Sequence, residues 1–344
     1  MIVAGTRSQS LHIPMLDASR VAESRRALGA LASRVGLPEP DAGRAQIVAT
    51  ELSNNLLRHA REGFLVARVL QDSEGRGVEI AAVDRGPGMD LQRCLADGFS
   101  TAGTPGTGLG AARRLSDSFD AYSLPSGSIV VARILASGAA ARRPSEPAPP
   151  QIGAICLAKA GEEMSGDAWA AETMAGGRTL IVVADGLGHG PLAADASAAA
   201  LATFHELAPS GRGPAEILGE VHRRLRSTRG AAVAIAEISP ASEELRFAGL
   251  GNVAAVVISG ASRRGLVSHN GTAGVTASPP RELSYPFAPH SLLVMASDGL
   301  ATHWDLGQYA GAVSRHPAVV SALLCRDFSR GRDDLTVVAV REAA

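Results

Sequence analysis

The sequence predicts two domains, an α/β layer domain followed by a sandwich of sheets covered by helices. A length of 344 residues suggests two domains rather than one. The stretch SGAAARRPSEPAPPQ is rich in proline, alanine and charge and has no apolar periodicity, so we interpret residues 138–151 as a linker. Helices and strands alternate before it, whereas the part after it is rich in strands with helices inserted in pairs. We therefore expect domains at 1–137 and 152–344.

The expected elements of the first domain begin with two helices. Apolar residues at helical spacing predict one helix over Asp17–Val35, and Pro38 opens a second that runs through Ala60. The apolar or alternating runs Phe64–Gln71 and Val78–Asp84 predict strands. After a glycine-rich stretch we expect a short helix and two further strands, over Ala111–Ser118, Ala121–Leu124 and Ser128–Leu135.

The second domain is expected to hold mostly strands, with two pairs of helices between them. The strands are predicted over Gln151–Ala158, Ala168–Met174, Thr179–Ala184, Ala231–Ile238, Glu244–Gly249, Ala254–Ser259, Ser291–Ala296 and Leu335–Arg341. The helices are predicted over Ala193–Leu207, Pro214–Ser227, Leu306–Arg315 and Ala318–Phe328.

Composition and charge exclude several classes of protein. Hydrophobic residues make up 46% and charged residues 19%, so the chain can build a buried core. A net charge of -1 gives no reason to expect nucleic acid or an anionic membrane as a partner. The three cysteines form no CxxC pattern, and no leader or membrane-spanning run stands out, so we expect a reduced, cytoplasmic chain. Because Lys159 is the only lysine and fits neither motif, a Walker-A loop and a protein-kinase fold are excluded.

Three polar segments of the first domain suggest a nucleotide site. Glu51, Asn55 and His59 recur at helical spacing and so share one face of the second helix. An asparagine oxygen with nucleotide phosphates is sufficient support for Mg²⁺, and a carboxylate one turn away could orient or deprotonate the attacking group. Asp84, at a strand end beside two glycines, could accept a hydrogen bond from an exocyclic amine. The glycine-rich run at 100–110 opens a helix and offers backbone N–H groups to phosphates.

Each segment also has a plainer interpretation. A Glu/Asn pair on a helix is usually a solvated face, and a DxGxG run is often only a turn. The GTGLG run would fit a dinucleotide-binding loop, but that loop should follow the first strand of a βαβ unit. The order and spacing of all three segments favour the nucleotide site.

Together the three segments resemble the conserved boxes of GHKL ATPases, which have the Bergerat α/β sandwich fold. The resemblance covers about residues 10–136 and is strongest to small serine kinases and anti-sigma factors of the RsbW, SpoIIAB and RsbT type, with the run at 98–110 most similar to RsbT. It implies ATP with Mg²⁺, Glu51 as catalytic base, Asn55 as magnesium ligand and Asp84 as adenine contact. The pocket and lid residues that it implies are Gly86, Gly88, Gly106, Thr107, Gly108 and Gly110. His59 is expected to pack or to support the site.

Acidic residues beside glycine recur at strand ends in the second domain. They are Asp167, Asp185, Asp298 and the neighbours Asp333 and Asp334. Asp-Gly is the commonest hairpin signal, so Asp185 and Asp298 could singly mark turns. Gathered together, however, the carboxylates would repel one another unless cations lay between them. Oxygen ligands favour Mg²⁺ or Mn²⁺ over Zn²⁺, and two such ions can bind phosphate and activate water.

The whole set resembles the metal-dependent serine/threonine phosphatases of the PPM family, an α-β-β-α sandwich, in its short SpoIIE, RsbU and RsbX branch. The runs at 183–190 and 297–300 carry the resemblance, which covers residues 152–341. It implies two Mn²⁺ or Mg²⁺ ions, with Asp185 catalytic through the metals. The implied metal ligands are Asp167, Asp185, the backbone oxygen of Gly186, Asp298 and Asp333, with Asp334 as the competitor for the last place. His189 could support the site or protonate a leaving oxygen, and a structural role is equally open.

Both families act in bacterial partner switching, where a kinase phosphorylates a STAS-domain protein and a phosphatase reverses that step. The resemblance therefore implies a bifunctional regulator of a STAS-domain phosphoprotein, with a sigma factor or a stressosome-like complex as a further partner. One alternative is a phosphatase with an ATP-sensing domain, against which Glu51 counts because a sensor needs no base. Another is a non-enzymatic module that binds a sigma factor.

Overall fold

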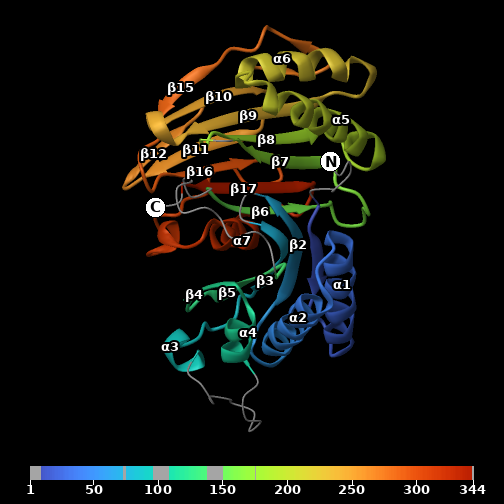
Figure 1. Cartoon of the computed structure of the whole chain (residues 1–344), viewed down its shortest axis with the longest axis vertical. Helices are drawn as coiled ribbons and strands as arrows, with labels where there is room; N and C mark the ends of the chain where they lie inside the picture. Colours follow the sequence, from blue (N-terminus) through green and yellow to red (C-terminus); the bar gives the residue numbers. More distant parts are fainter. Residues whose placement is uncertain (1–8, 73–74, 96–107, 138–149, 175, 343–344) are drawn as a thin grey trace. The chain divides into compact units, whose positions relative to one another are not determined.

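The computed structural model describes residues 9–72, 75–95, 108–137, 150–174 and 176–342, and the chain packs as two compact units (Figure 1). The first unit holds Ser10–Arg142 together with Leu306–Arg326. The second holds Met1–Gln9, Arg143–Asp305 and Asp327–Ala344. None of the described helices has both the length and the apolar character needed to span a bilayer.

The first unit is built on a five-stranded antiparallel sheet in the order β1-β2-β3-β5-β4. Its strands are β1 (Leu11–Pro14), β2 (Phe64–Asp72), β3 (Gly75–Val83), β4 (Ser118–Leu124) and β5 (Gly127–Leu135). The helices of this part of the chain are α1 (Ser19–Val35), α2 (Glu39–His59), α3 (Leu91–Cys94) and α4 (Leu109–Leu115). Apolar side chains of α1, α2 and α4 pack against one face of the sheet and form a single core with it.

Local sequence explains the ends of the two long helices. Gly36 ends α1 in the left-handed conformation, with φ +71°, which glycine adopts without strain. Pro38 precedes α2, whose first turn carries the acidic residues that a helix N-terminus favours. The predictions of both long helices, the short helix and four of the five strands are confirmed, with bounds shifted by a few residues. The short elements β1 and α3 were not predicted, because four residues carry too little periodicity.

The second unit is a sandwich of two five-stranded sheets. One sheet has the order β15-β10-β9-β8-β7 and the other β12-β11-β16-β17-β6. The strands are β6 (Gln151–Leu157), β7 (Asp167–Thr173), β8 (Thr179–Gly186), β9 (Ala231–Ser239), β10 (Glu244–Leu250), β11 (Ala254–Ser259), β12 (Ser262–Gly265), β15 (Leu283–Pro286), β16 (Leu292–Ala296) and β17 (Leu335–Arg341). A small ribbon joins β13 (Gly271–Thr272) to β14 (Thr276–Ala277).

Apolar side chains fill the space between the two sheets. Ile181 and Phe247 of the first sheet and Met295 and Val338 of the second belong to one buried cluster. Helices α5 (Pro191–Leu207) and α6 (Pro214–Arg224) pack on the outer face of the first sheet through a second cluster (Figure 1). The predicted sheet sandwich covered by helices is therefore confirmed.

The chain between β16 and β17 differs from its prediction. The helix predicted over Leu306–Arg315 is wrong, since only Ala312–Ser314 form a short 3₁₀ turn there. Gly307 and Gly311 interrupt this stretch, and Gly311 adopts φ +73°, which an α-helix does not allow. The next helix, α7 (Pro317–Phe328), is confirmed.

Residues Leu306–Arg326 pack with the first unit although they lie far along the chain from it. Residues 138–149 of the predicted linker lie outside the described residues. The domain bounds 1–137 and 152–344 stay a prediction, and the packing adds that one segment of the second half contributes to the first unit.

Candidate functional sites

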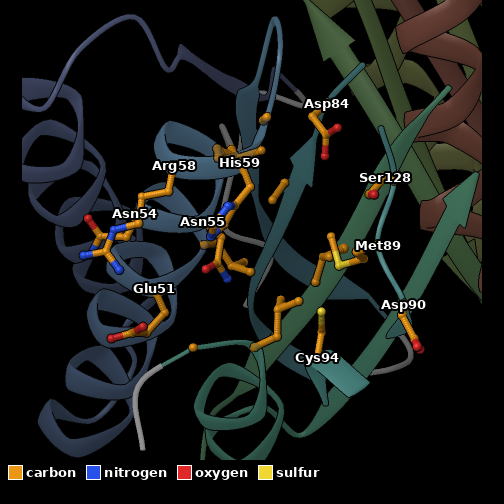
Figure 2. Close-up of a pocket in the computed structure, with 18 of the residues that line it drawn as sticks. Glu51, Asn54, Asn55, Arg58, His59, Asp84, Met89, Asp90, Cys94 and Ser128 are labelled. Atoms are coloured by element: carbon orange, nitrogen blue, oxygen red, sulfur yellow. The ribbon is translucent and has the colours of Figure 1, made fainter. Parts of the chain in front are cut away.

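The face of α2 that carries Glu51, Asn55 and His59 borders a cavity of about 630 Å³ in the first unit (Figure 2). The continuous helix places the three side chains on successive turns of one face, as predicted. The other side of the cavity is formed by strand β5, which carries Ser128, and by the residues directly after β3, which begin with Asp84. A cavity of this volume is typical of small-molecule sites.

Asp84 is fixed at the end of β3 by backbone hydrogen bonds. Its N–H donates to the carbonyl oxygen of Ser128 at 3.0 Å, and its Oδ1 accepts the N–H of Gly86 at 2.6 Å. Burial raises the pKa of Asp84, and the hydrogen bond from Gly86 opposes that shift. Because Oδ1 is engaged, Oδ2 is left to accept a hydrogen bond from a ligand in the cavity.

Two of the predicted pocket glycines are required by close packing. Gly88 has φ +77°, and a Cβ there would lie 2.2 Å from the carbonyl oxygen of Leu124. A Cβ on Gly86 would lie 2.9 Å from Oδ1 of Asp84. Gly108 lines the cavity directly before α4, and Gly110 lies in the first turn of that helix. The predicted residues Gly106 and Thr107 lie outside the described residues.

The polar groups on α2 suit a phosphate-bearing ligand. Burial raises the pKa of Glu51, while Arg58 and the N–H of Gly108 oppose the shift. A raised pKa suits a group that has to take up a proton. Nδ2 of Asn55 is shielded from water and has no hydrogen-bond partner among the described residues, so it could donate to a phosphate oxygen, while the amide oxygen is the atom that could hold Mg²⁺. These residues fit a magnesium nucleotide, and their individual roles stay predictions.

In the second unit, Asp167 and Asp185 face each other across neighbouring strands. Asp167 begins β7 and pairs in register with Asp185 near the end of β8. Burial, reinforced by Asp334 and Asp298, raises the pKa of Asp167 to about 7. Burial, then the charge of Asp167 and those of the other acids, raises the pKa of Asp185 to about 8. The fold therefore brings the predicted acids within electrostatic reach of one another.

The neighbours Asp333 and Asp334 differ in their bonding. Asp334 is 3% exposed, and its two carboxylate oxygens accept the N–H groups of Lys159 and Gly166, each at 2.8 Å. Asp333 is exposed, and its Oδ1 accepts the N–H of Asp334 at 3.0 Å. Asp334 is thus engaged in holding two loops together, which favours Asp333 as the metal ligand. That assignment stays a prediction.

The acidic set fits a divalent cation in its chemistry. Oδ2 of Asp167 is buried and has no hydrogen-bond partner within the described part of the chain, so a cation would satisfy it. Oxygen donors alone are the set that Mg²⁺ and Mn²⁺ favour. As they lie, no three described Asp, Glu, His or Cys side chains stand close enough to enclose an ion. Binding would therefore require carboxylates to turn toward the metal, and the ligand roles stay predictions.

Gly186 and His189 follow Asp185 and differ in their surroundings. A Cβ on Gly186 would lie 2.1 Å from the carbonyl oxygen of Ala193, so only glycine fits between the strand end and α5. The backbone oxygen is then the donor that Gly186 can offer. Nδ1 of His189 lies 2.7 Å from Oε1 of Glu162 in a half-exposed pair, which favours a structural role for this histidine.

Sequence reasoning missed three residues at these sites. Ser128 supplies the carbonyl oxygen that positions Asp84, but it lies in an apolar strand without a signal of its own. Nδ2 of Asn252 donates to Oδ2 of Asp298 at 2.7 Å from the Gly-Asn turn after β10. That turn is visible in the sequence, but its partner is not. No local pattern links Glu162 to His189.

Comparisons with known proteins match the two parts of the chain to two different families. Residues 15–134 match the family described as histidine kinase-like ATPase domain. Residues 175–342 match the family described as stage II sporulation protein E (SpoIIE). The predicted resemblances of the two halves and their fold classes are therefore confirmed.

Individual relatives match parts of the chain. "Serine/threonine-protein kinase RsbT" of Bacillus subtilis (strain 168) is 35% identical over 80 residues, which are 23% of this chain and 60% of that protein, so less than two thirds of its length is matched. A structure titled "The bacterial stressosome: a modular system that has been adapted to control secondary messenger signaling" is 26% identical with a TM-score of 0.51, over 56% of this chain and 99% of its own. "Crystal structure of RsbX in complex with magnesium in space group P1" is 20% identical with a TM-score of 0.50, over 59% and 98%.

Proposed function

We propose that this chain, which joins a histidine kinase-like ATPase domain to a SpoIIE-type domain of the PPM phosphatase fold, is a bifunctional partner-switching regulator. Its first half transfers a phosphoryl group from ATP to a serine or threonine, and its second half removes phosphate from such a side chain. One observation carries the proposal: a single chain holds both a cavity lined by Glu51 and Asp84 and the facing pair Asp167 and Asp185 on neighbouring strands.

In the kinase half, each pocket residue has one task. Asp84 accepts a hydrogen bond from the adenine amine. Because Asp84 is buried, a base without that amine would leave its carboxylate oxygen without a partner, and this favours adenine. The amide oxygen of Asn55 would hold Mg²⁺ together with the phosphates, whose charge the bound ion would neutralise. Glu51 takes the proton from the attacking hydroxyl, a task that its raised pKa supports. The match to a serine/threonine-protein kinase supports a protein hydroxyl as acceptor.

In the phosphatase half, the acids of the strand ends hold the metals. The ligands that we propose are Asp167, Asp185, the backbone oxygen of Gly186, Asp298 and Asp333. Two Mn²⁺ or Mg²⁺ ions, when bound, polarise the phosphate and make a water nucleophilic. The chain's own contribution is to hold the carboxylates in place: Asn252 orients Asp298, and the N–H groups of Lys159 and Gly166 fix the loop before β17 through Asp334.

The partner that we propose is a STAS-domain phosphoprotein in a sigma-factor or stressosome-like pathway. The family resemblance of both halves supports it, as does the likeness to a structure titled for the bacterial stressosome. A phosphatase with an ATP-sensing domain is the second candidate. It is favoured by the hydrogen bond that Arg326, a residue from the second half of the sequence, donates to the carbonyl oxygen of Asp84.

When a kinase and a phosphatase act in turn on one partner, the net reaction is ATP hydrolysis, and it occurs only when that partner is present. Release of inorganic phosphate therefore tests the proposal. The full chain is incubated with ATP, Mn²⁺ and each STAS-domain protein encoded beside it, and phosphate release is followed. We expect release that depends on the STAS protein and that both Glu51→Ala and Asp298→Ala abolish. Release that survives in Glu51→Ala would contradict the kinase half. Loss of release only in Glu51→Ala would contradict the phosphatase half.

A further inference from the structure

Residues Leu306–Arg326, which we name the α7 segment, belong to the phosphatase half by sequence but to the first unit by packing. They fall inside the SpoIIE match at 175–342. The segment includes most of α7 and the turn before it. Its contacts within the first unit show what it holds there.

The start of the α7 segment is bonded to the edge strand β4. The hydroxyl of Tyr122 donates to the carbonyl oxygen of Ala310 at 3.1 Å. The carboxylate of Asp120 accepts the N–H of His316 at 2.8 Å and Nη1 of Arg315 at 3.3 Å. Since the Asp120 contacts precede α7 directly, they fix where this helix begins.

The end of the segment is bonded to the residue that we expect to contact adenine. Nη1 of Arg326 donates to the carbonyl oxygen of Asp84 at 3.1 Å, and the guanidinium of Arg85 donates to the carbonyl oxygen of Arg326. Arg326 is only 4% exposed, so this charged side chain is committed to contacts inside the protein. Gly127 leaves room for it, because a Cβ there would lie 2.7 Å from Nη1 of Arg326. Arg326 and residues 84–85 therefore hold each other reciprocally.

Beyond Arg326, the end of α7 contacts the loop that carries Asp298. Within the second unit, Ala301 donates its N–H to the carbonyl oxygen of Phe328 at 2.9 Å, and Arg330 donates to that of Gly299 at 2.9 Å. These two bonds pair Leu300 with Ser329 in an isolated antiparallel β-bridge. Because Gly299 follows Asp298 directly, a displacement of the last turn of α7 is transmitted to that acid by covalent continuity and by two backbone hydrogen bonds.

We propose that α7 couples the nucleotide cavity to the phosphatase acids, with Arg326 as the residue that positions Asp84. Nucleotide bound at Asp84 changes how Arg326 holds the end of α7, and the loop of Asp298 responds with a change in phosphatase rate. The proposal rests on the proposed function of the cavity as an ATP site. It gives the kinase half a second task, which is to report nucleotide occupancy to the phosphatase half.

The test measures p-nitrophenyl phosphate hydrolysis by the full chain with Mn²⁺, with and without a non-hydrolysable ATP analogue at saturation. The readout is the ratio of the two rates for each variant, so differences in basal rate cancel. In the wild-type chain we expect a ratio that differs from one by about fivefold or more. Arg326→Gln should bring the ratio close to one, and Arg326→Lys, which keeps one cationic donor, should restore part of it. The matched control is Arg34→Gln, an exposed arginine in the last turn of α1, which should keep the wild-type ratio.

Calorimetry with the same analogue separates the two proposals. If the wild-type chain binds no nucleotide, the proposed function of the cavity fails. If it binds but the rate ratio stays at one, the coupling alone is wrong. A rate ratio in Arg326→Gln equal to that of the wild type would also overturn the coupling. Should that variant fail to fold, Asp120→Asn loosens the start of the same segment and is judged by the same ratio, which we expect to fall toward one.

Discussion

Asp167 lies directly opposite Asp185 on the neighbouring strands β7 and β8, so that two carboxylates are held together at the buried end of a sheet. Like charges at this position destabilise a sheet unless a cation lies between them or one of the two groups is protonated. Burial raises the pKa of both groups, so the metal-free site keeps protons that a metal would have to displace.

The first prediction concerns the pH dependence of Mn²⁺ binding. Since the pKa of Asp167 is raised to about 7 and that of Asp185 to about 8, both carboxyls are mostly protonated at pH 6. We expect the affinity of the full chain for Mn²⁺, measured by calorimetry, to rise steeply from pH 6 to pH 8. The thermal stability of the metal-free chain should fall over the same interval, because the folded pKa values lie above the unfolded value of 3.8. A flat binding profile would contradict the proposed site.

Asp185→Asn should abolish phosphatase activity. The amide keeps the shape of the side chain but lacks the negative charge with which the carboxylate is proposed to hold the metals. Hydrolysis of a phosphoserine peptide by the full chain with Mn²⁺ measures the effect. Asp195→Asn, a change on the nearby helix α5, serves as the control and should leave the rate within about twofold, as expected for a site away from the metals. Full activity of Asp185→Asn, or of a chain treated with EDTA, would rule out the metal mechanism.

Asp84→Asn should weaken ATP binding by about tenfold or more. The substitution replaces an anionic acceptor, whose hydrogen bond contributes about 1.5–3 kcal/mol, with a neutral one. Isothermal titration of the full chain with a non-hydrolysable analogue gives the affinity. Glu39→Gln removes a carboxylate from the first turn of α2 and should bind as the wild type does. Equal affinity of Asp84→Asn and the wild type would remove Asp84 from the adenine site.

Glu79, Arg68 and Arg133 form a buried group of charges on the sheet of the first unit, and this group makes the free energy of unfolding depend on pH. Oε1 of Glu79 lies 2.7 Å from Nε of Arg68, and its Oε2 lies 2.6 Å from Nη2 of Arg133. Burial alone would raise the pKa of Glu79, but the two guanidinium groups outweigh it and lower the pKa to about 2. The contribution of Glu79 to stability is therefore complete above pH 4.5, its ordinary pKa, and is lost as pH falls toward 2.

Glu79→Gln should therefore destabilise the chain at pH 7 by about 3–5 kcal/mol, because two buried arginines lose their counter-charge. The difference in unfolding free energy between variant and wild type should shrink as pH falls below 4.5. Denaturant unfolding at pH 7 and at pH 3, followed by circular dichroism, measures both differences. A difference that is the same at the two pH values would show that the charge of Glu79 does not stabilise the unit.

Much of the fold and of both sites could be predicted because the signals are local. The face shared by Glu51 and Asn55 follows from helical periodicity alone. Asp185 and Asp298 were recognisable because each lies at or just beyond the end of an apolar strand and beside a glycine. The register that sets Asp167 opposite Asp185 could not be predicted, since it depends on pairing between strands rather than on either strand by itself.

The position of the α7 segment was beyond prediction for a different reason. The side chains of α7 are buried for most of its length, so its apolar pattern does not indicate which surface it covers. The helix expected just before it was wrong, because apolar spacing was given more weight than Gly307 and Gly311. The bond between Arg326 and Asp84 joins residues far apart in sequence, and no local pattern of either residue records it.

The central claim is that both sites act on one side chain of one partner, and phosphosite mapping tests it most directly. A STAS-domain partner is incubated with ATP and Mn²⁺ in the presence of the Asp298→Ala chain, and the phosphorylated product is then given to the Glu51→Ala chain. Peptide mass spectrometry should locate the added phosphate on a single serine or threonine and show its removal from that same residue. Addition and removal at different residues, or on different proteins, would contradict the claim.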